Sequence, residues 1–231
     1  MSVQFRDLIA AASSSLARDH GFRAHGGRSF TREDELIRSA RFAPGASLAG
    51  SFQFEVVCDL GISGLSSISS KSSEWMVRCS VSHVPRDDGL PRSGFELTGA
   101  PEDEVVVQDV AKICKVVFDR FLLRHETADD MFLWVRDNAL QFLDSPQVDN
   151  DFKRFRLSPW NIVPRLELAG VYAAYLGRSE DAERLRDAAI QYARTHGLRY
   201  AIPTVSANIA AAAQVAAGPA GGPAGDGIPS D

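Results

Sequence analysis

Two segments of this chain alternate between apolar and other residues, and this period of two constrains the fold more than any other feature. In the first, over residues 52–60, every second position holds Phe52, Phe54, Val56, Cys58 and Leu60. In the second, over residues 75–83, the same positions hold Trp75, Val77, Cys79, Val81 and His83. Successive side chains of a strand point to opposite faces, so each segment predicts a strand with one buried and one mostly solvent-facing side. Together they predict the centre of an antiparallel sheet.

A helix is predicted before these strands, over about residues 3–20, because apolar residues recur there at helical spacing. Gly21 follows at a position where a glycine in the left-handed conformation commonly ends a helix. Phe22, directly after it, can supply the apolar contact that accompanies such a cap.

Three further segments are expected to complete the sheet. Residues 28–33 and 35–42 contain strand-favouring residues and are expected to form a hairpin. The Pro-Gly-Ala stretch at 44–46 is then expected to break the chain. Residues 94–98 are expected to form a short edge strand. Two loops are expected to connect the strands, over residues 61–73 and 85–91.

From Pro101 onward the apolar period changes from two to 3.6, which predicts helices. Pro101 suits the first position of a long helix. Thr127 can cap the next helix, with Asp130 answering three residues later as in a capping box. Two more helices are expected to form a hairpin that is closed by Gly177 and Gly197, with Ser179 as the cap of its second helix.

We therefore predict an α+β fold, with an N-terminal helix, an antiparallel sheet of four to five strands and then four C-terminal helices. Residues 1–145 are expected to form the α+β domain, and residues 146–200 a helical hairpin packed on it. Residues 201–231 are rich in Ala, Gly and Pro, and we expect a mostly disordered tail there.

The bulk composition limits where the protein works and what it binds. The net charge of -5 gives no overall attraction to nucleic acid or to an anionic membrane. The three cysteines lie far apart without a Cys-x-x-Cys pair, which favours free thiols in a reducing compartment. No signal peptide and no apolar stretch of membrane-spanning length are recognisable. We therefore expect a cytoplasmic protein.

Two parts of the chain resemble known families. The turn formed by Gly21, Phe22, Arg23, Phe30 and Arg32, followed by the strand at 52–61, resembles the bacterial Domain of Unknown Function 4304 over the first third of the chain. The Gly26-Gly27 pair and His25 depart from that family's pattern. The resemblance implies an α+β fold and a cytoplasmic bacterial protein, and it implies no activity and no site residues.

The C-terminal hairpin resembles a single tetratricopeptide unit. Its matching positions are Leu168, Ala169, Tyr172, Leu176, Gly177, Ala182, Leu185, Ala189 and Ala193. Such repeats need about three copies to form a solenoid. With one copy, the hairpin is expected to pack on the rest of the domain.

No catalytic, metal or cofactor motif is recognisable in the sequence. His20, His25 and His83 lack the close spacing that places metal ligands together, so we predict no metal site and no cofactor. The acidic stretch at 149–151 lacks the glycine and the terminal glutamate of a calcium loop. The glycine pairs at 26–27 and 61–64 do not open a helix, as a phosphate-binding loop would.

Two segments are candidates for binding. The first holds Arg23, His25, Arg28 and Arg32, with aromatic residues between them. These residues could contact RNA or phosphate, could meet an acidic protein partner, or could form a solvated face with weak ion pairs. The second holds Trp160 with two nearby phenylalanines, Phe152 and Phe155. It could be an interaction surface, although such aromatics more often fix a long loop to the core.

The sequence leaves three functional hypotheses. The leading one is a non-catalytic protein-binding module of an accessory or immunity type, because folding signals are strong and chemical signals are absent. The second is an enzyme whose site is assembled from scattered residues, with His25, His83, Glu55 and Asp59 as candidates. The third is RNA or phosphate binding through the early arginines, which the acidic net charge opposes.

Overall fold

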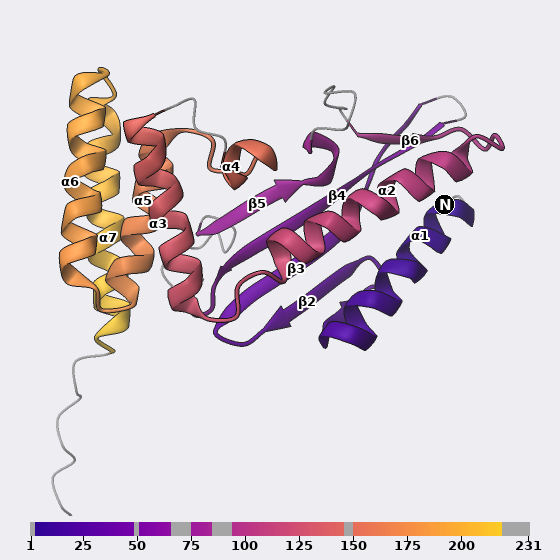
Figure 1. Cartoon of the computed structure of the whole chain (residues 1–231), viewed down its shortest axis with the longest axis horizontal. Coiled ribbons are helices and arrows are strands. Elements are labelled where there is room, and N and C mark those ends of the chain that lie inside the picture. Colours follow the sequence, from indigo (N-terminus) through magenta and orange to yellow (C-terminus); the bar gives the residue numbers. More distant parts are fainter. Residues whose placement is uncertain (1–2, 49–50, 66–74, 85–93, 146–149, 219–231) are drawn as a thin grey trace, which may run out of the picture.

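The computed structural model describes residues 3–48, 51–65, 75–84, 94–145 and 150–218, and its fold is α+β (Figure 1). An antiparallel sheet is covered on one face by two helices, and a bundle of helices stands at one end of the sheet. This confirms the predicted fold class. The loop expected over 61–73 begins later, because Gly61 and Ile62 belong to the strand β4 (Ser51–Ile62). Residues 66–73, the loop expected at 85–91 and the last part of the expected tail, from 219, lie outside the described residues.

The described sheet has six strands, in the order β1-β2-β3-β4-β5, with β6 also paired to β4. All pairs are antiparallel. The strands are β1 (Arg23–His25), β2 (Ser29–Glu33), β3 (Leu36–Leu48), β4 (Ser51–Ile62), β5 (Met76–Ser80) and β6 (Phe95–Leu97). The two alternating segments therefore lie side by side as β4 and β5, with Cys58 directly opposite Cys79.

Three details of the sheet differ from the prediction. Residues 23–25, expected within a glycine turn, form the short strand β1. The expected break at 44–46 is wrong, because β3 passes through it with a register shift between Pro44 and Ser47, and a bulge can accommodate Pro and Gly within a strand. The strand expected over 75–83 ends at Ser80, and Val81–His83 form a 3₁₀ turn.

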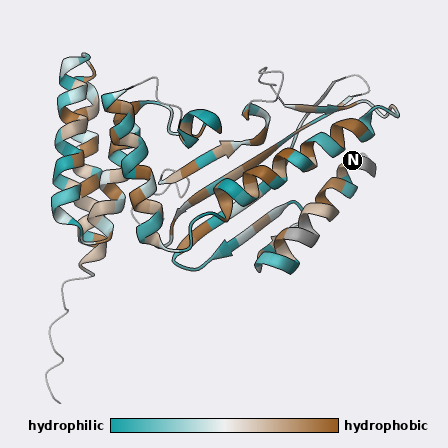
Figure 2. Cartoon of the chain, in the orientation of Figure 1, coloured by the Kyte–Doolittle hydropathy of each residue, from teal (hydrophilic) through white to brown (hydrophobic). Residues whose placement is uncertain are grey.

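The inner face of the sheet packs on the helices α1 (Val3–Ser13) and α2 (Asp103–Val117). Phe5 of α1 lies 4.9 Å, between ring centroids, from both Phe52 and Phe54 of β4. Figure 2 shows hydrophobic residues along β4 and α2. Both helices continue as π-helical turns, η1 (Ser14–Asp19) and η4 (Phe118–Leu122). The predicted helix over 3–20 is thus confirmed, and Phe22 is buried after Gly21 as expected.

The C-terminal helices begin after η4, and the second of them is a single turn. They are α3 (Ala128–Asp144), α4 (Asp151–Arg154), α5 (Ile162–Tyr175), α6 (Ser179–Thr195) and α7 (Ile202–Ala216). The predicted cap at Thr127 is confirmed, because its hydroxyl oxygen accepts from the Asp130 N–H at 3.1 Å. The predicted cap at Ser179 is wrong by one residue, since Arg178 occupies the cap position and makes no side-chain cap bond.

Helix α7 corrects the expectation that the chain is mostly disordered from residue 201. Its alanines favour a helix, and three regularly spaced residues are buried: Val205, Ile209 and Ala212. Gly170 of α5 permits the close approach, because a Cβ atom there would lie 2.6 Å from the Ile209 Cδ1. The first part of the Ala-rich segment therefore forms a helix that packs on α5, despite its low-complexity composition.

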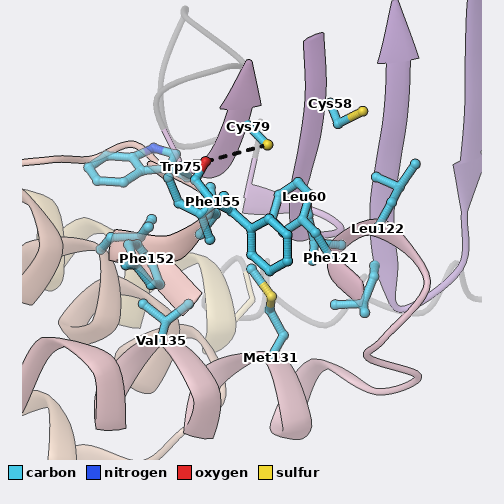
Figure 3. Close-up of a cluster of buried hydrophobic side chains, with 14 of the residues drawn as sticks. Cys58, Leu60, Trp75, Cys79, Phe121, Leu122, Met131, Val135, Phe152 and Phe155 are labelled. Atoms are coloured by element: carbon cyan, nitrogen blue, oxygen red, sulfur yellow. Dashed lines mark hydrogen bonds between the residues drawn. The ribbon is translucent and has the colours of Figure 1, made fainter. Parts of the chain in front are cut away.

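The sheet and the bundle share one apolar core. Figure 3 shows side chains of β4 and β5, among them Leu60 and Cys79, facing those of α3 and of the segment around α4. The Cys79 thiol lies 3.7 Å from the Phe155 carbonyl oxygen, as a weak hydrogen-bond donor. Helix α3 and the segment around α4 thus pack on the sheet, while the division expected at residues 145 and 146, with a separate hairpin packed on the domain, stays a prediction. Within the described ranges, no helix has both the length and the apolar character to span a bilayer.

Candidate functional site

A cavity lies between the segment before α5, the end of α6 and the start of α7. It has a volume of about 520 Å³. A second cavity of about 310 Å³ shares Pro164, Glu167 and Thr204 with it and reaches Arg78 on β5. We call the two together the C-terminal groove. The residues that matter below are Arg78, Phe142, Trp160, Glu167, Tyr192 and Tyr200.

Two aromatic side chains of this groove are exposed to solvent. Trp160 is 50% exposed and Tyr200 is 80% exposed. Among the large hydrophobic residues that are exposed in the described ranges, the others are all valines. The expectation that aromatics near α4 fix their loop to the core is confirmed for Phe152 and Phe155, which are buried, but it is wrong for Trp160.

Arg165 of α5 holds the segment that carries Trp160. Its guanidinium donates to the Pro159 carbonyl oxygen at 3.1 Å and to the Trp160 carbonyl oxygen at 3.2 Å. It also lies over the rings of Phe152 and Phe142, at 4.4 and 5.0 Å from their centroids. Burial lowers the pKa of Arg165 to about 10, so the side chain remains charged at neutral pH.

The same segment is tied to the sheet. The backbone of Ser158 exchanges two hydrogen bonds with Arg78 of β5, at 3.0 and 2.8 Å. The ring of His83 meets Trp160 edge-on, with 6.1 Å between the centroids. Trp160 is therefore exposed on a segment that is fixed from two sides, and a binding surface fixed in advance loses less entropy when a ligand binds.

The charges in the groove are few. Glu167 accepts a hydrogen bond of 2.6 Å from the Asn208 side-chain amide of α7, which orients its carboxylate. Arg78 forms an ion pair with Asp59, with 2.6 Å between Nε and Oδ1. The hydrogen bond with Asp59 raises the pKa of Arg78. The carboxylate of Asp59 thus balances the charge of Arg78 at the sheet end of the groove.

The outer face of the sheet carries a network of carboxylates and hydroxyls. Glu55 accepts hydrogen bonds from Ser80 and from Ser82. Asp59 accepts from Arg78 and from Ser39. Asp59 is 8% exposed, so the side of β4 that was expected to be mostly wet is largely covered at its centre. These bonds hold the two carboxylates in place on the outer face of the sheet.

The four residues proposed for an assembled catalytic site each have other partners. Glu55 and Asp59 lie on the same face of β4, each in its own hydrogen-bonded group. His25 is hydrogen-bonded to the Thr31 hydroxyl at 2.7 Å, in the β1–β2 hairpin, and His83 lies beside Trp160. In the ranges that the structure describes, no hydrogen bond joins any two of these four residues.

The predicted basic cluster is divided between the two faces of the sheet. Arg23 pairs with Thr31 across β1 and β2, so the two side chains share a face with His25. Arg32, the next residue after Thr31, points to the opposite face, where it forms an ion pair of 2.9 Å with Asp34. Arg28 is half-buried before β2. The cluster is therefore not one continuous patch.

Neither the cysteines nor the acidic residues form a reactive or metal-binding group in the described part of the chain. No group there of three or more His, Cys, Asp or Glu residues could hold a metal ion. The three cysteines are buried and free. Burial raises the pKa of Cys79 and of Cys114 to about 12, and that of Cys58 well above its ordinary value. Such thiols are protonated and unreactive at neutral pH.

Sequence reasoning identified Trp160 but missed the residues that surround it. Tyr200 and Thr204 lie at or beside the part of the chain that was assigned to the tail, so one wall of the groove was absent from the prediction. Tyr200 follows Gly197 and directly precedes a helix that begins at Ile202. A tyrosine in such a short connection between two helices is the sequence signal that could have indicated this wall of the groove.

Comparisons with family models, with curated proteins and with solved structures found no match to this chain. The resemblance of residues 21–61 to the Domain of Unknown Function 4304 therefore stays a prediction.

Proposed function

We propose that this chain is a non-catalytic protein-binding module, of an accessory or immunity type, that holds a segment of a partner protein in the C-terminal groove. One observation carries the proposal: the two exposed aromatic residues, Trp160 and Tyr200, line the same groove. Trp and Tyr are enriched in protein interfaces and supply much of their binding energy.

The way in which Trp160 is held supports this function. The bonds from Arg165 and the pairing of Ser158 with Arg78 fix the segment while leaving the indole half exposed. Exposed apolar surface of this size is unfavourable in water by roughly 25 cal/mol per Å². Covering Trp160 with a partner would remove this apolar surface from water and so favour binding.

The two other hypotheses have weaker support. An enzyme needs an acid, a base or a nucleophile within reach of one another, and His25, His83, Glu55 and Asp59 are held in separate places. RNA binding through the early arginines needs a continuous basic surface, and Arg23 and Arg32 face opposite sides of the sheet.

Selection of peptides from a random phage-displayed library on the immobilised full chain tests the proposal. We expect enriched peptides to bind in the micromolar range and to lose at least tenfold in affinity when Trp160→Ala and Tyr200→Ala are combined. The matched control is Val105→Ala on α2, because Val105 is 61% exposed and lies outside the groove.

The control variant should bind like the original chain. If no peptide is enriched, or if the enriched peptides bind the double variant as tightly as the original chain, the proposed function is wrong.

A further inference from the structure

We infer that the segment held in the C-terminal groove is rich in proline and binds as a polyproline II helix. This inference rests on the proposed function, because it specifies the composition and conformation of the partner segment at the same site. It combines three observations: the fixed rings on the walls of the groove, the hydrogen-bond donors that these walls carry, and the small number of charges beside them.

Three aromatic side chains that line the larger cavity are held by their neighbours. The guanidinium of Arg165 lies over the ring of Phe142, at 5.0 Å from its centroid. The ring of Tyr192 is stacked on that of His196, with 3.9 Å between the centroids and 14° between the planes. Trp160 is held through its backbone, because Arg165 donates to its carbonyl oxygen. A wall of fixed rings favours a ligand that is itself fixed in shape, as a proline-rich polyproline II segment is, because neither partner then loses much conformational entropy.

Three side chains of the larger cavity carry hydrogen-bond donors: the indole N–H of Trp160 and the phenolic hydroxyls of Tyr192 and Tyr200. No hydrogen bond between described residues uses any of these three groups. A polyproline II helix has no internal hydrogen bonds, so its backbone carbonyl oxygens can accept from such donors. The walls therefore match a proline-rich segment, which presents both apolar rings and unpaired carbonyl oxygens.

A partner strand or a partner α-helix fits these walls less well. Binding of a strand needs a row of unpaired backbone groups at the edge of a sheet. The groove lies among the helices α5, α6 and α7 (Figure 1), and the backbone of Ser158 already pairs with Arg78, in the middle of the outer edge of β5. The carbonyl oxygens of an α-helix are bonded within the helix, except in its last turn, so a helix leaves the side-chain donors of the groove without acceptors.

The charges of the groove favour an uncharged segment. Among the described residues that line the larger cavity, Glu167 alone carries a charge, and its carboxylate already accepts from the Asn208 amide. In the smaller cavity, Arg78 is paired with Asp59 through two hydrogen bonds. An acidic or phosphorylated segment is bound by a cluster of arginines, whereas proline carries no charge and needs no such cluster.

The test compares two peptides that have the same composition and opposite helical hand, acetyl-hexaproline amide made from L-proline and from D-proline. Binding is followed by ¹⁹F NMR on the full chain labelled with 5-fluorotryptophan, in which the Trp160 signal is assigned by its loss in Trp160→Phe. We expect the L-peptide to shift the Trp160 signal at millimolar concentrations, and the D-peptide to need roughly tenfold more. Tyr200→Ala, which removes one ring and one donor, should weaken binding of the L-peptide by about fivefold.

Val105→Ala, on α2 and outside the groove, is the matched control and should bind the L-peptide like the original chain. Equal responses to the two peptides, no response to the L-peptide, or unchanged binding in Tyr200→Ala would overturn the inference. A phage selection whose Trp160-dependent peptides carry no proline would also overturn it while leaving the proposed function intact. A selection that enriches no peptide overturns the proposed function and this inference with it.

Discussion

Aromatic side chains gather in two regions of this molecule, and their surroundings differ. Under α1, the rings of Phe5, Phe54 and Phe95 are buried, with neighbouring centroids 4.9 and 5.4 Å apart. In the C-terminal groove, Trp160 and Tyr200 remain exposed, although the segment that holds Trp160 is fixed by Arg165 and by β5. The first region stabilises the fold, and the second leaves aromatic surface exposed to solvent.

This difference separates two consequences of mutation. Removing a ring from the sheet core should lower the free energy of unfolding, because the transfer energy is lost and a cavity remains. Removing a ring from the groove should leave stability nearly unchanged and should weaken binding. The four predictions below test this contrast in order of decreasing effect on stability.

The largest effect is expected for Phe54→Ala. Phe54 is 2% exposed and contacts the rings of Phe5 and Phe95. We expect the free energy of unfolding to fall by about 3–5 kcal/mol, measured by urea denaturation. Tyr200→Ala serves as the comparison and should change it by less than about 0.5 kcal/mol. Equal losses in the two variants would remove the distinction between the regions.

The next effect is expected for Arg165→Ala, because the Arg165 side chain links the Trp160 segment to the buried ring of Phe152. The variant loses the hydrogen bonds to the Pro159 and Trp160 carbonyl oxygens and the contacts with two rings, so we expect a loss of about 2–3 kcal/mol. Acrylamide should quench the fluorescence of Trp160 more strongly, because its segment is released. Unchanged quenching would mean that Arg165 does not hold this segment.

A third effect concerns His125, which is 6% exposed and whose ring lies tilted against Trp134 with 4.7 Å between the centroids. Burial lowers its pKa from about 6.5 to about 4. The unfolded chain therefore takes up this proton at a higher pH than the folded chain does. The contribution of the neutral His125 ring to the free energy of unfolding is fully present above pH 6.5 and is lost as the pH falls towards 4. Between pH 7 and pH 5 the loss should be about 2 kcal/mol.

His125→Phe keeps a ring at this position and removes the titration. Urea denaturation at pH 7 and at pH 5 should show a smaller loss in the variant than in the original chain. The same loss in both would assign the pH dependence to other groups.

The smallest effect on stability is expected for Trp160→Ala. Because half of the side chain is already exposed, its removal should lower the free energy of unfolding by less than about 1 kcal/mol. Thermal unfolding followed by circular dichroism measures this change. A loss as large as that of Phe54→Ala would show that Trp160 belongs to the folding core.

Local patterns in the sequence predicted most of the fold. The period of two in β4 and β5 directly reports which residues face the core, and the cap at Thr127 depends on residues three positions apart. Helix α7 escaped prediction because its stability comes from packing of Ile209 against Gly170, which are 39 positions apart in the chain.

The groove was only partly predictable for the same reason. Trp160 was identified as a single residue, but whether it is buried or exposed depends on Arg165 and on the pairing of Ser158 with Arg78. The early arginines lie within ten residues of one another in the sequence, yet strand alternation divides Arg23 and Arg32 between opposite faces. Closeness along the chain therefore does not show whether two side chains share a face of the sheet.

The most direct test uses two of the three tryptophans of the chain as reporters, one in the buried core and one in the C-terminal groove. Trp134 is buried in the core beside Phe121 and Phe152, whereas Trp160 lies in the groove. In ¹⁹F NMR of the 5-fluorotryptophan-labelled chain, titrated with a peptide selected on that chain, we predict that the Trp160 signal moves and that the Trp134 signal does not. A bound peptide that leaves the Trp160 signal unchanged would contradict the account.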